Sequence, residues 1–203
     1  MLFRSPQTVH AAVIDVSVGK ADLQQCADAV MRLRAEFQWQ REDYAAIHFN
    51  FVNGFNARYD RWRAGERIWV KGNKTGWSSG GGPTPGRVAF DKYLRWVFMY
   101  ANTASLEKEL RPRRLEEVET GDVFIHGGFP GHAVIVVDRA VNAATGDVEI
   151  LLAQSYMPAQ DIHVLRNPAR RDGNPWYSVR IMREEGAVTT PEWYFSTEEL
   201  RHF

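Results

Sequence analysis

The chain has 203 residues, of which 44% are hydrophobic, and its 25 Lys and Arg balance its 25 Asp and Glu, so the formal net charge is zero. This size suits one folded domain with a sizeable core, and the charge balance provides no attraction for nucleic acid or an anionic membrane surface. A single cysteine excludes an internal disulfide. No apolar run approaches the ~18 residues that a membrane span needs, and we expect no export signal in the N-terminal segment.

The N-terminal third begins with a strand and a helix. Residues 11–18 alternate as a strand does, and residues 22–38 have the spacing of an amphipathic helix. Asp22 is a suitable N-cap residue, and Gln25 three positions later completes a variant of the capping box. This start makes Cys26 the fourth helical residue.

The middle of the chain combines aromatic segments with one long Gly- and Pro-rich segment that interrupts regular secondary structure. Residues 45–55 predict a strand that ends at the Asn53-Gly54 turn. The Gly- and Pro-rich segment 77–86 predicts a mobile loop, which we expect to lie over or beside the active site. Helical spacing returns in residues 87–101, and residues 102–110 predict a second, shorter helix before Pro112.

The C-terminal half changes to strands. The strand-like runs "GDVFIHGG", "GHAVIVVDRAV", "GDVEILLAQSY" and "DIHVLRN" are separated by Gly, Pro and Asn, and residues 142–147 are a suitable hairpin connection. Helices that precede an antiparallel meander indicate an α+β fold. We therefore expect N-terminal helices packed on an antiparallel β-meander.

The sequence is compatible with two roles for Cys26, as a nucleophile or as a core residue. Near the positive end of a helix dipole a thiol pKa falls, and the thiolate is the nucleophile. Equally, Cys26 shares a helix face with Leu23, Val30 and Phe37, and free cysteine is a common core residue. The sequence leaves both readings open.

His132 is the best candidate for the base that such a nucleophile needs. It follows the flexible "GGFPG" turn, opens a buried strand, and shares a face with Val134 and Val136. Gln154 ends the next, antiparallel strand, where its amide is expected to accept from one ring nitrogen and fix the tautomer. A purely structural role for both residues remains an alternative.

Three other histidines compete with this assignment. His48 lies within the predicted strand 45–55, and His126 and His163 lie on predicted strands of the meander. A zinc site formed by His126, His132 and His163 is an alternative, but no tight ligand spacing supports it. We expect neither a metal nor a cofactor.

The order of these residues resembles the NlpC-type branch of papain-like cysteine peptidases, which act on bacterial cell walls. That branch has a cysteine on a helix, a histidine opening a strand, and a polar residue on the following strand; "GDVFIHGGFPGHAVIVVD" is similar to its histidine segment. The resemblance implies Cys26 as nucleophile, His132 as base and Gln154 as third member. The chain departs from it with "QQCAD" in place of the usual "DCSG", and with 106 positions between Cys26 and His132.

Longer motifs identify the chain as a member of a bacterial family known only as a domain of unknown function (4846). They are "ADLQQCADAVMRLRAE", "HFNFVNGF", "FDKYLRWVFMYANTASLEKEL", "GDVFIHGGFPGHAVIVVD" and "LLAQSYMPAQDIHVLRNP". The resemblance implies a bacterial cell-envelope or periplasmic protein and supplies no reaction.

These observations predict a single papain-like domain over residues 1–203, with residues 40–115 as a helical and loop insertion. The expected activity is hydrolysis of an amide bond in a peptide or peptidoglycan stem peptide. The Cys26 backbone N–H and either Gln24 or Gln25 would hold the oxyanion, and Trp77 would contact the substrate. The alternatives are a non-catalytic module that binds cell-wall fragments and a thiol acyltransferase.

Overall fold

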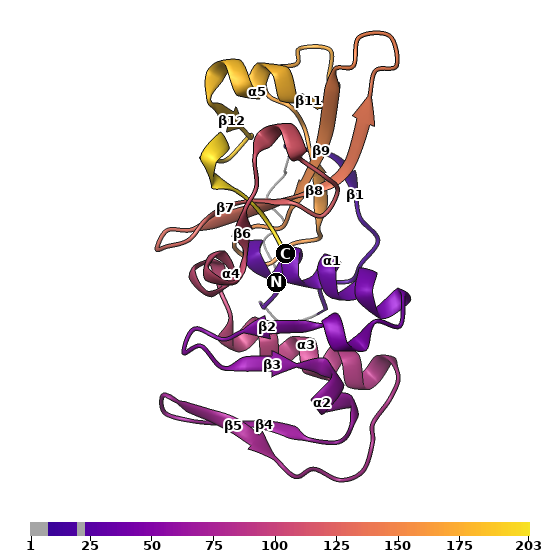
Figure 1. The fold of residues 1–203 in the computed structure, drawn as a ribbon, viewed down its shortest axis with the longest axis vertical. Helices are drawn as coiled ribbons and strands as arrows, with labels where there is room; N and C mark the ends of the chain where they lie inside the picture. Colours follow the sequence, from indigo (N-terminus) through magenta and orange to yellow (C-terminus); the bar gives the residue numbers. More distant parts are fainter. Residues whose placement is uncertain (1–7, 20–22) are drawn as a thin grey trace.

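The computed structural model describes residues 8–19 and 23–203, and it is an α+β protein with antiparallel sheets, as predicted (Figure 1). The helices of this part of the chain are α1 (Cys26–Gln40), α2 (Tyr59–Arg63), α3 (Arg87–Tyr100), α4 (Thr103–Glu109) and α5 (Val179–Glu185), with short 3-10 turns at Tyr44–Ala46, Leu115–Glu117 and Thr197–Glu199. The strands are β1 (His10–Val13), β2 (His48–Asn50), β3 (Asn56–Arg58), β4 (Arg67–Lys71), β5 (Lys74–Ser78), β6 (Arg111–Pro112), β7 (Val123–His126), β8 (His132–Val141), β9 (Val148–Gln154), β10 (His163–Leu165), β11 (Tyr177–Ser178), β12 (Ala187–Thr189), β13 (Tyr194–Ser196) and β14 (Leu200–His202).

The largest sheet has the strand order β1-β10-β9-β8-β7-β14-β6, with β11 added beside β9, and all its pairs are antiparallel. Strands β7 to β10 are neighbours in chain order, so the predicted meander is confirmed. Residues 142–147 connect β8 to β9, as the sequence predicts. The start of β8 and the end of β9 therefore lie at the same end of this strand pair, which brings His132 and Gln154 together.

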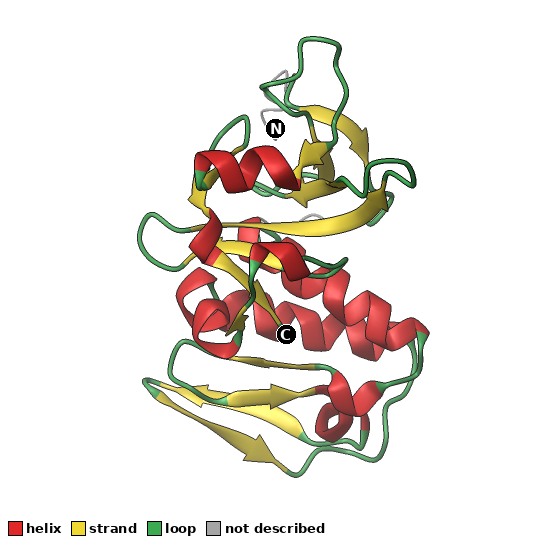
Figure 2. Ribbon diagram, turned by 45° about the horizontal axis from the view of Figure 1, so that its top comes forward, coloured by secondary structure: helices red, strands yellow, loops and turns green. Residues whose placement is uncertain are grey.

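Helices α1 and α3 form a layer between the large sheet and the two small hairpins β2–β3 and β4–β5 (Figures 1 and 2). The hairpins and α3 belong to the segment 40–115 that the sequence suggested as an insertion. Its apolar residues share one core with α1 and the sheet: Phe49, Tyr59 and Leu94 pack in the same cluster as Val30 and Ile135. The segment contains strands as well as the helices and loops expected of it.

The central strands are apolar on both faces because both faces are covered. Ala133 and Ile135 belong to the core on the α1 side, whereas Val134 and Val136 belong to the core on the α5 side. This double burial explains the unbroken apolar run at the start of β8. By the two-residue alternation of a strand, His132 faces the α5 side with Val134 and Val136.

Three element boundaries differ from the sequence prediction. The strand expected over residues 11–18 is β1, which begins at His10 and ends at Val13. Helix α1 begins at Cys26 with Gln25 as its N-cap residue, so Cys26 is the first helical residue and not the fourth. The proposed cap Asp22 lies outside the described residues. The strand expected over residues 45–55 is only the three-residue strand β2, and the partner strand β3 begins just after this range, at Asn56. The turn between them contains Gly54 at φ 82°, where only glycine is unstrained.

Within the described residues, no helix combines the length and the apolar character needed to cross a membrane.

Candidate functional site

Cys26 lies at the point where α1 meets the start of β8. As the first residue of α1 it is placed among the free N–H groups of the helix N-terminus. Its Sγ lies 3.9 Å from the carbonyl oxygen of Gly131, the residue before β8. The backbone N–H of Ala133 also interacts favourably with the thiolate form. The thiol is thus held against the backbone on both sides of His132.

The thiol pKa is raised, which is opposite to the sequence prediction. Burial raises the pKa of Cys26 most strongly, and the nearby Asp28 carboxylate raises it further. The backbone N–H groups of Ala27 and Cys26 lower it, as expected at a helix N-terminus. Their effect is smaller than that of desolvation, so Cys26 is a protonated thiol at neutral pH.

His132 and Gln154 form the hydrogen bond that the sequence predicts. The ring Nε2 of His132 lies 2.7 Å from Oε1 of Gln154, and the two residues are 2% and 0% exposed. An amide oxygen can only accept, so Nε2 carries the proton in this contact. The neutral ring then has its lone pair on Nδ1, which is the tautomer that a base needs.

Glu192 fixes the orientation of the Gln154 amide. Its carboxylate accepts a short hydrogen bond from Nε2 of Gln154, and a carboxylate tolerates only the N–H side of the amide. The amide oxygen is therefore turned toward His132. Glu192 lies in the loop between β12 and β13. Sequence reasoning missed it, because no local pattern indicates which loop residue reaches the end of β9.

Aromatic side chains enclose the imidazole. The ring centroid of His132 lies 5.2 Å from those of Tyr156 and Trp193, and 6.0 Å from that of Phe195. This burial lowers the pKa of His132, although the hydrogen bond to Gln154 partly opposes the shift. The pKa of Tyr156 is raised by burial and by the charges of Glu192 and Cys26. Tyr156 thus lies within electrostatic reach of both the thiol and the Glu192 carboxylate.

Within the described part of the chain, no hydrogen bond joins the thiol and the imidazole. Cys26 pairs with Gly131, and His132 pairs with Gln154. The reason is the geometry of the sheet: α1 packs on one face of β8, whereas the His132 ring faces Phe195 on the other. The two side chains can meet only around the end of the strand.

The two glutamines suggested as oxyanion donors have other contacts. Oε1 of Gln24 lies 3.4 Å from Nη1 of Arg32, and Gln24 is 1% exposed. The Gln24 carbonyl oxygen accepts from the Ser155 hydroxyl at 3.0 Å. Gln25 is the N-cap residue of α1, and its backbone N–H donates to Asp28 at 3.1 Å. Gln24 and Ser155 thereby connect the segment before Cys26 to the end of β9.

Trp77 and the loop after it lie elsewhere. Trp77 belongs to β5, where its ring contacts Phe55 and the Arg61 guanidinium. The loop is tied to α2 by the hydrogen bond from Thr84 N–H to Arg63 O at 3.0 Å. The β4–β5 hairpin occupies the end of the molecule away from β8 and β9 (Figure 1). The loop therefore lies beside this hairpin and not over Cys26, in contrast to the expectation.

The competing histidines are not grouped as a metal site. His126 pairs with Glu199 at 2.6 Å, His48 lies 3.0 Å from Glu109, and Nδ1 of His163 lies 3.0 Å from the Asp161 carbonyl oxygen. Throughout residues 8–19 and 23–203, no three His, Cys, Asp or Glu side chains are placed to hold a metal ion.

Comparison with known proteins gives one match. The family model described as "Domain of unknown function (4846)" matches residues 3–202. No curated protein and no solved structure matches the chain.

Proposed function

Since the chain belongs to the family of the domain of unknown function (4846), whose description names no reaction, we propose a function from the site: thiol-dependent hydrolysis of an amide bond. The observations that carry the proposal are the hydrogen bond between His132 Nε2 and Gln154 Oε1, at 2.7 Å, and a helix N-terminal thiol that contacts Gly131, the residue before His132. A histidine in a fixed tautomer next to a nucleophile is the arrangement that covalent catalysis uses.

In the proposed reaction, Sγ of Cys26 attacks the amide carbonyl carbon while its proton passes to Nδ1 of His132. The imidazolium then protonates the leaving nitrogen, the C–N bond breaks, and a thioester remains. Water attacks the thioester carbonyl carbon, gives its proton to Nδ1, and releases the carboxylic acid with the restored thiol. Gln154 and Glu192 hold the ring throughout. Before attack, the thiol must turn from the Gly131 carbonyl oxygen to Nδ1 of His132. Hydrogen bonds between catalytic groups are often long or poorly aligned in unliganded sites.

The directions of the two pKa shifts specify the starting state. Burial raises the pKa of Cys26 and lowers that of His132. Both shifts favour a neutral thiol and a neutral imidazole over a preformed thiolate–imidazolium pair. His132 therefore acts as a general base during attack.

The oxyanion would be held at the N-terminus of α1. The free N–H groups of the first helical turn are directed toward developing negative charge there. We assign the donor role to the Cys26 N–H, because it belongs to the nucleophile itself and lies in the first turn of α1.

The helix N-terminal thiol, the strand-opening histidine and the antiparallel meander support a papain-like fold of the NlpC type. By that resemblance, the proposed substrate is a peptidoglycan stem peptide and the proposed location is the bacterial cell envelope. No further group is needed for this chemistry beyond the thiol, the imidazole and water.

The test is cleavage of purified stem peptides, followed by mass spectrometry of the released carboxyl and amino products. Cys26→Ser and His132→Ala are expected to lose cleavage by roughly 10²–10⁴-fold, the usual contribution of general acid–base catalysis. His126→Ala is the matched control, because His126 lies opposite His132 in the β7–β8 pair but bonds to Glu199. It should retain activity.

Iodoacetamide labelling separates this proposal from a non-catalytic binding module. The raised thiol pKa and the Cys26–Gly131 contact favour the binding module. Labelling of native Cys26 that slows in His132→Ala supports the enzyme. Labelling only after denaturation, or cleavage that persists in Cys26→Ser, would overturn it. Transfer of the acyl group to added amines instead of water would identify an acyltransferase.

A further inference from the structure

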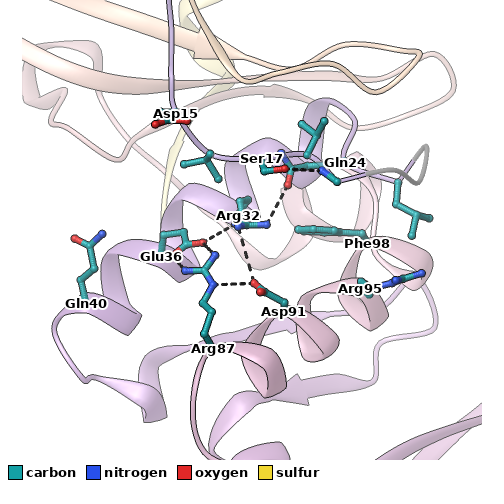
Figure 3. A pocket seen from close by; sticks show the side chains of 14 residues that line it. Asp15, Ser17, Gln24, Arg32, Glu36, Gln40, Arg87, Asp91, Arg95 and Phe98 are labelled. Carbon is teal, nitrogen blue, oxygen red and sulfur yellow. Dashed lines mark hydrogen bonds and ion pairs between the residues drawn. The ribbon is translucent and has the colours of Figure 1, made fainter. Parts of the chain in front are cut away.

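A second site lies beside α1 and does not include the thiol. A pocket of about 740 Å³ is bounded by α1, α3 and the segment 15–19 (Figure 3). Its volume is within the range of small-molecule sites. Cys26 is not among the lining residues, which are Asp15, Val16, Ser17, Val18, Gly19, Leu23, Gln24, Arg32, Glu36, Gln40, Arg87, Asp91, Arg95 and Phe98.

Four charged residues on one side of the pocket neutralise one another. Glu36 accepts from Nε of Arg32 at 2.7 Å and from both terminal nitrogens of Arg87 at 2.7 and 2.6 Å. Asp91 accepts from Nε of Arg87 at 3.0 Å. Two cations therefore balance two anions there, and this network stiffens the wall between α1 and α3.

Gln24 also lines the pocket, and its amide has an unused hydrogen-bond donor. Its oxygen faces Arg32, which can only donate, so the orientation of the amide is fixed. Its Nε2 is buried and has no hydrogen-bond partner among the described residues. A buried amide N–H group without an acceptor is unfavourable and uncommon in native proteins. A ligand carbonyl oxygen would satisfy it.

Outside this network, the pocket is lined by one more cation, Arg95, and one more anion, Asp15. Among the side chains drawn in Figure 3, none forms an ion pair or hydrogen bond with Arg95. Gln24, Phe98 and Arg95 lie along one side of the pocket, with Phe98 between the other two, whereas Asp15 lies at the opposite side (Figure 3). An apolar surface therefore separates an amide donor from a guanidinium.

We propose that this pocket binds the C-terminal residue of a peptide or an N-acylated amino acid. The ligand carboxylate pairs with Arg95, its acyl carbonyl accepts from Gln24 Nε2, and its apolar side chain packs on Phe98 and Leu23. The two ligand sources share this chemistry. The proposal is independent of the reaction at Cys26, because it uses none of the residues assigned to that reaction.

The test is calorimetric titration of the full chain with N-acetyl-L-leucine, with N-acetyl-L-leucinamide as the uncharged control. Cys26→Ser protein is titrated in parallel, so that turnover cannot contribute. We expect saturable binding of the acid, with about tenfold weaker binding of the amide, as the loss of one charge-assisted contact predicts. A blocked tripeptide ending in leucine binds more tightly than the acid if peptides are the ligand, and no better if free acylated amino acids are.

Two variants locate the binding. Arg95→Gln alters an exposed side chain and should reduce binding of the acid to the level of the amide while leaving the amide unchanged. Gln24→Glu should weaken both ligands, because it replaces the N–H donors with an acceptor. Arg180→Gln, at an exposed ion pair on α5, is the control and should change neither. Equal binding of acid and amide, no saturable binding of the acid or the tripeptide, or an unaffected Arg95→Gln would overturn the proposal.

Discussion

Replacement of Gln154 by alanine tests how His132 is held. The change leaves the buried Nε2–H of His132 without an acceptor, which costs about 2 kcal/mol, and the lost methylene adds about 1 kcal/mol. For a chain of this size, a total of about 3 kcal/mol lowers Tm by roughly 6–12 °C. Without the amide oxygen the ring no longer favours the Nε2–H tautomer. If His132 is the base, cleavage then falls by about 10²–10⁴-fold.

The assays are thermal unfolding by circular dichroism and nitrogen NMR of the His132 ring, which distinguishes the two tautomers without any substrate. Gln154→Glu is the companion variant, because it keeps an oxygen for Nε2–H but places a second carboxylate beside Glu192. Gln38→Ala removes another buried glutamine, on α1, and should leave the tautomer unchanged. If Gln154→Ala keeps both its Tm and the Nε2–H tautomer, the account of this hydrogen bond is wrong.

Two further predictions concern charge near the site. Burial raises the pKa of Asp28 well above its usual range, so its charge acts on the thiol only where this carboxyl is ionised. At alkaline pH, Asp28→Asn should lower the pKa of Cys26 and speed its alkylation, because the Asp28 charge is one of the causes that raise this pKa. Asp43→Asn, an exposed change beyond the other end of α1, is the control, and identical alkaline pH–rate profiles for Asp28→Asn and wild type would contradict the reasoning. The pKa of His132 is lowered in the folded state, so the unfolded state binds more protons and stability falls as pH drops below ~6.5 toward the lowered value. Chemical denaturation of His132→Gln across this range should show a shallower decline than wild type, and parallel curves would exclude the burial effect.

Local patterns predicted the elements that depend on local interactions. The connection 142–147 and the helices over residues 87–101 and 102–110 occur where expected, since turn residues and helical spacing act within a few positions. The contact between His132 and Gln154 also followed from sequence, because adjacent antiparallel strands joined by a short turn bring their outer ends together. Their catalytic roles remain predictions.

The features of the site that the sequence did not predict depend on contacts between residues far apart in the chain. The thiol pKa was predicted from the helix terminus and a nearby imidazole, whereas desolvation by burial in the folded chain has the larger effect. Glu192 and Trp193 reach the site from a loop that no short motif marks. The position of the loop after Trp77 is set by hydrogen bonds to α2, which composition cannot reveal.

The place of β14 in the sheet also affects how the protein is made. Residues 200–202 pair with β7 on one side and with β6 on the other, so on the ribosome this edge of β7 stays uncovered until residues 200–202 have emerged. An open strand edge in a nascent chain is a template for pairing with other chains. Translation that pauses before residues 200–202 emerge would therefore leave an aggregation-prone intermediate, because β14 is the strand that covers this edge of β7.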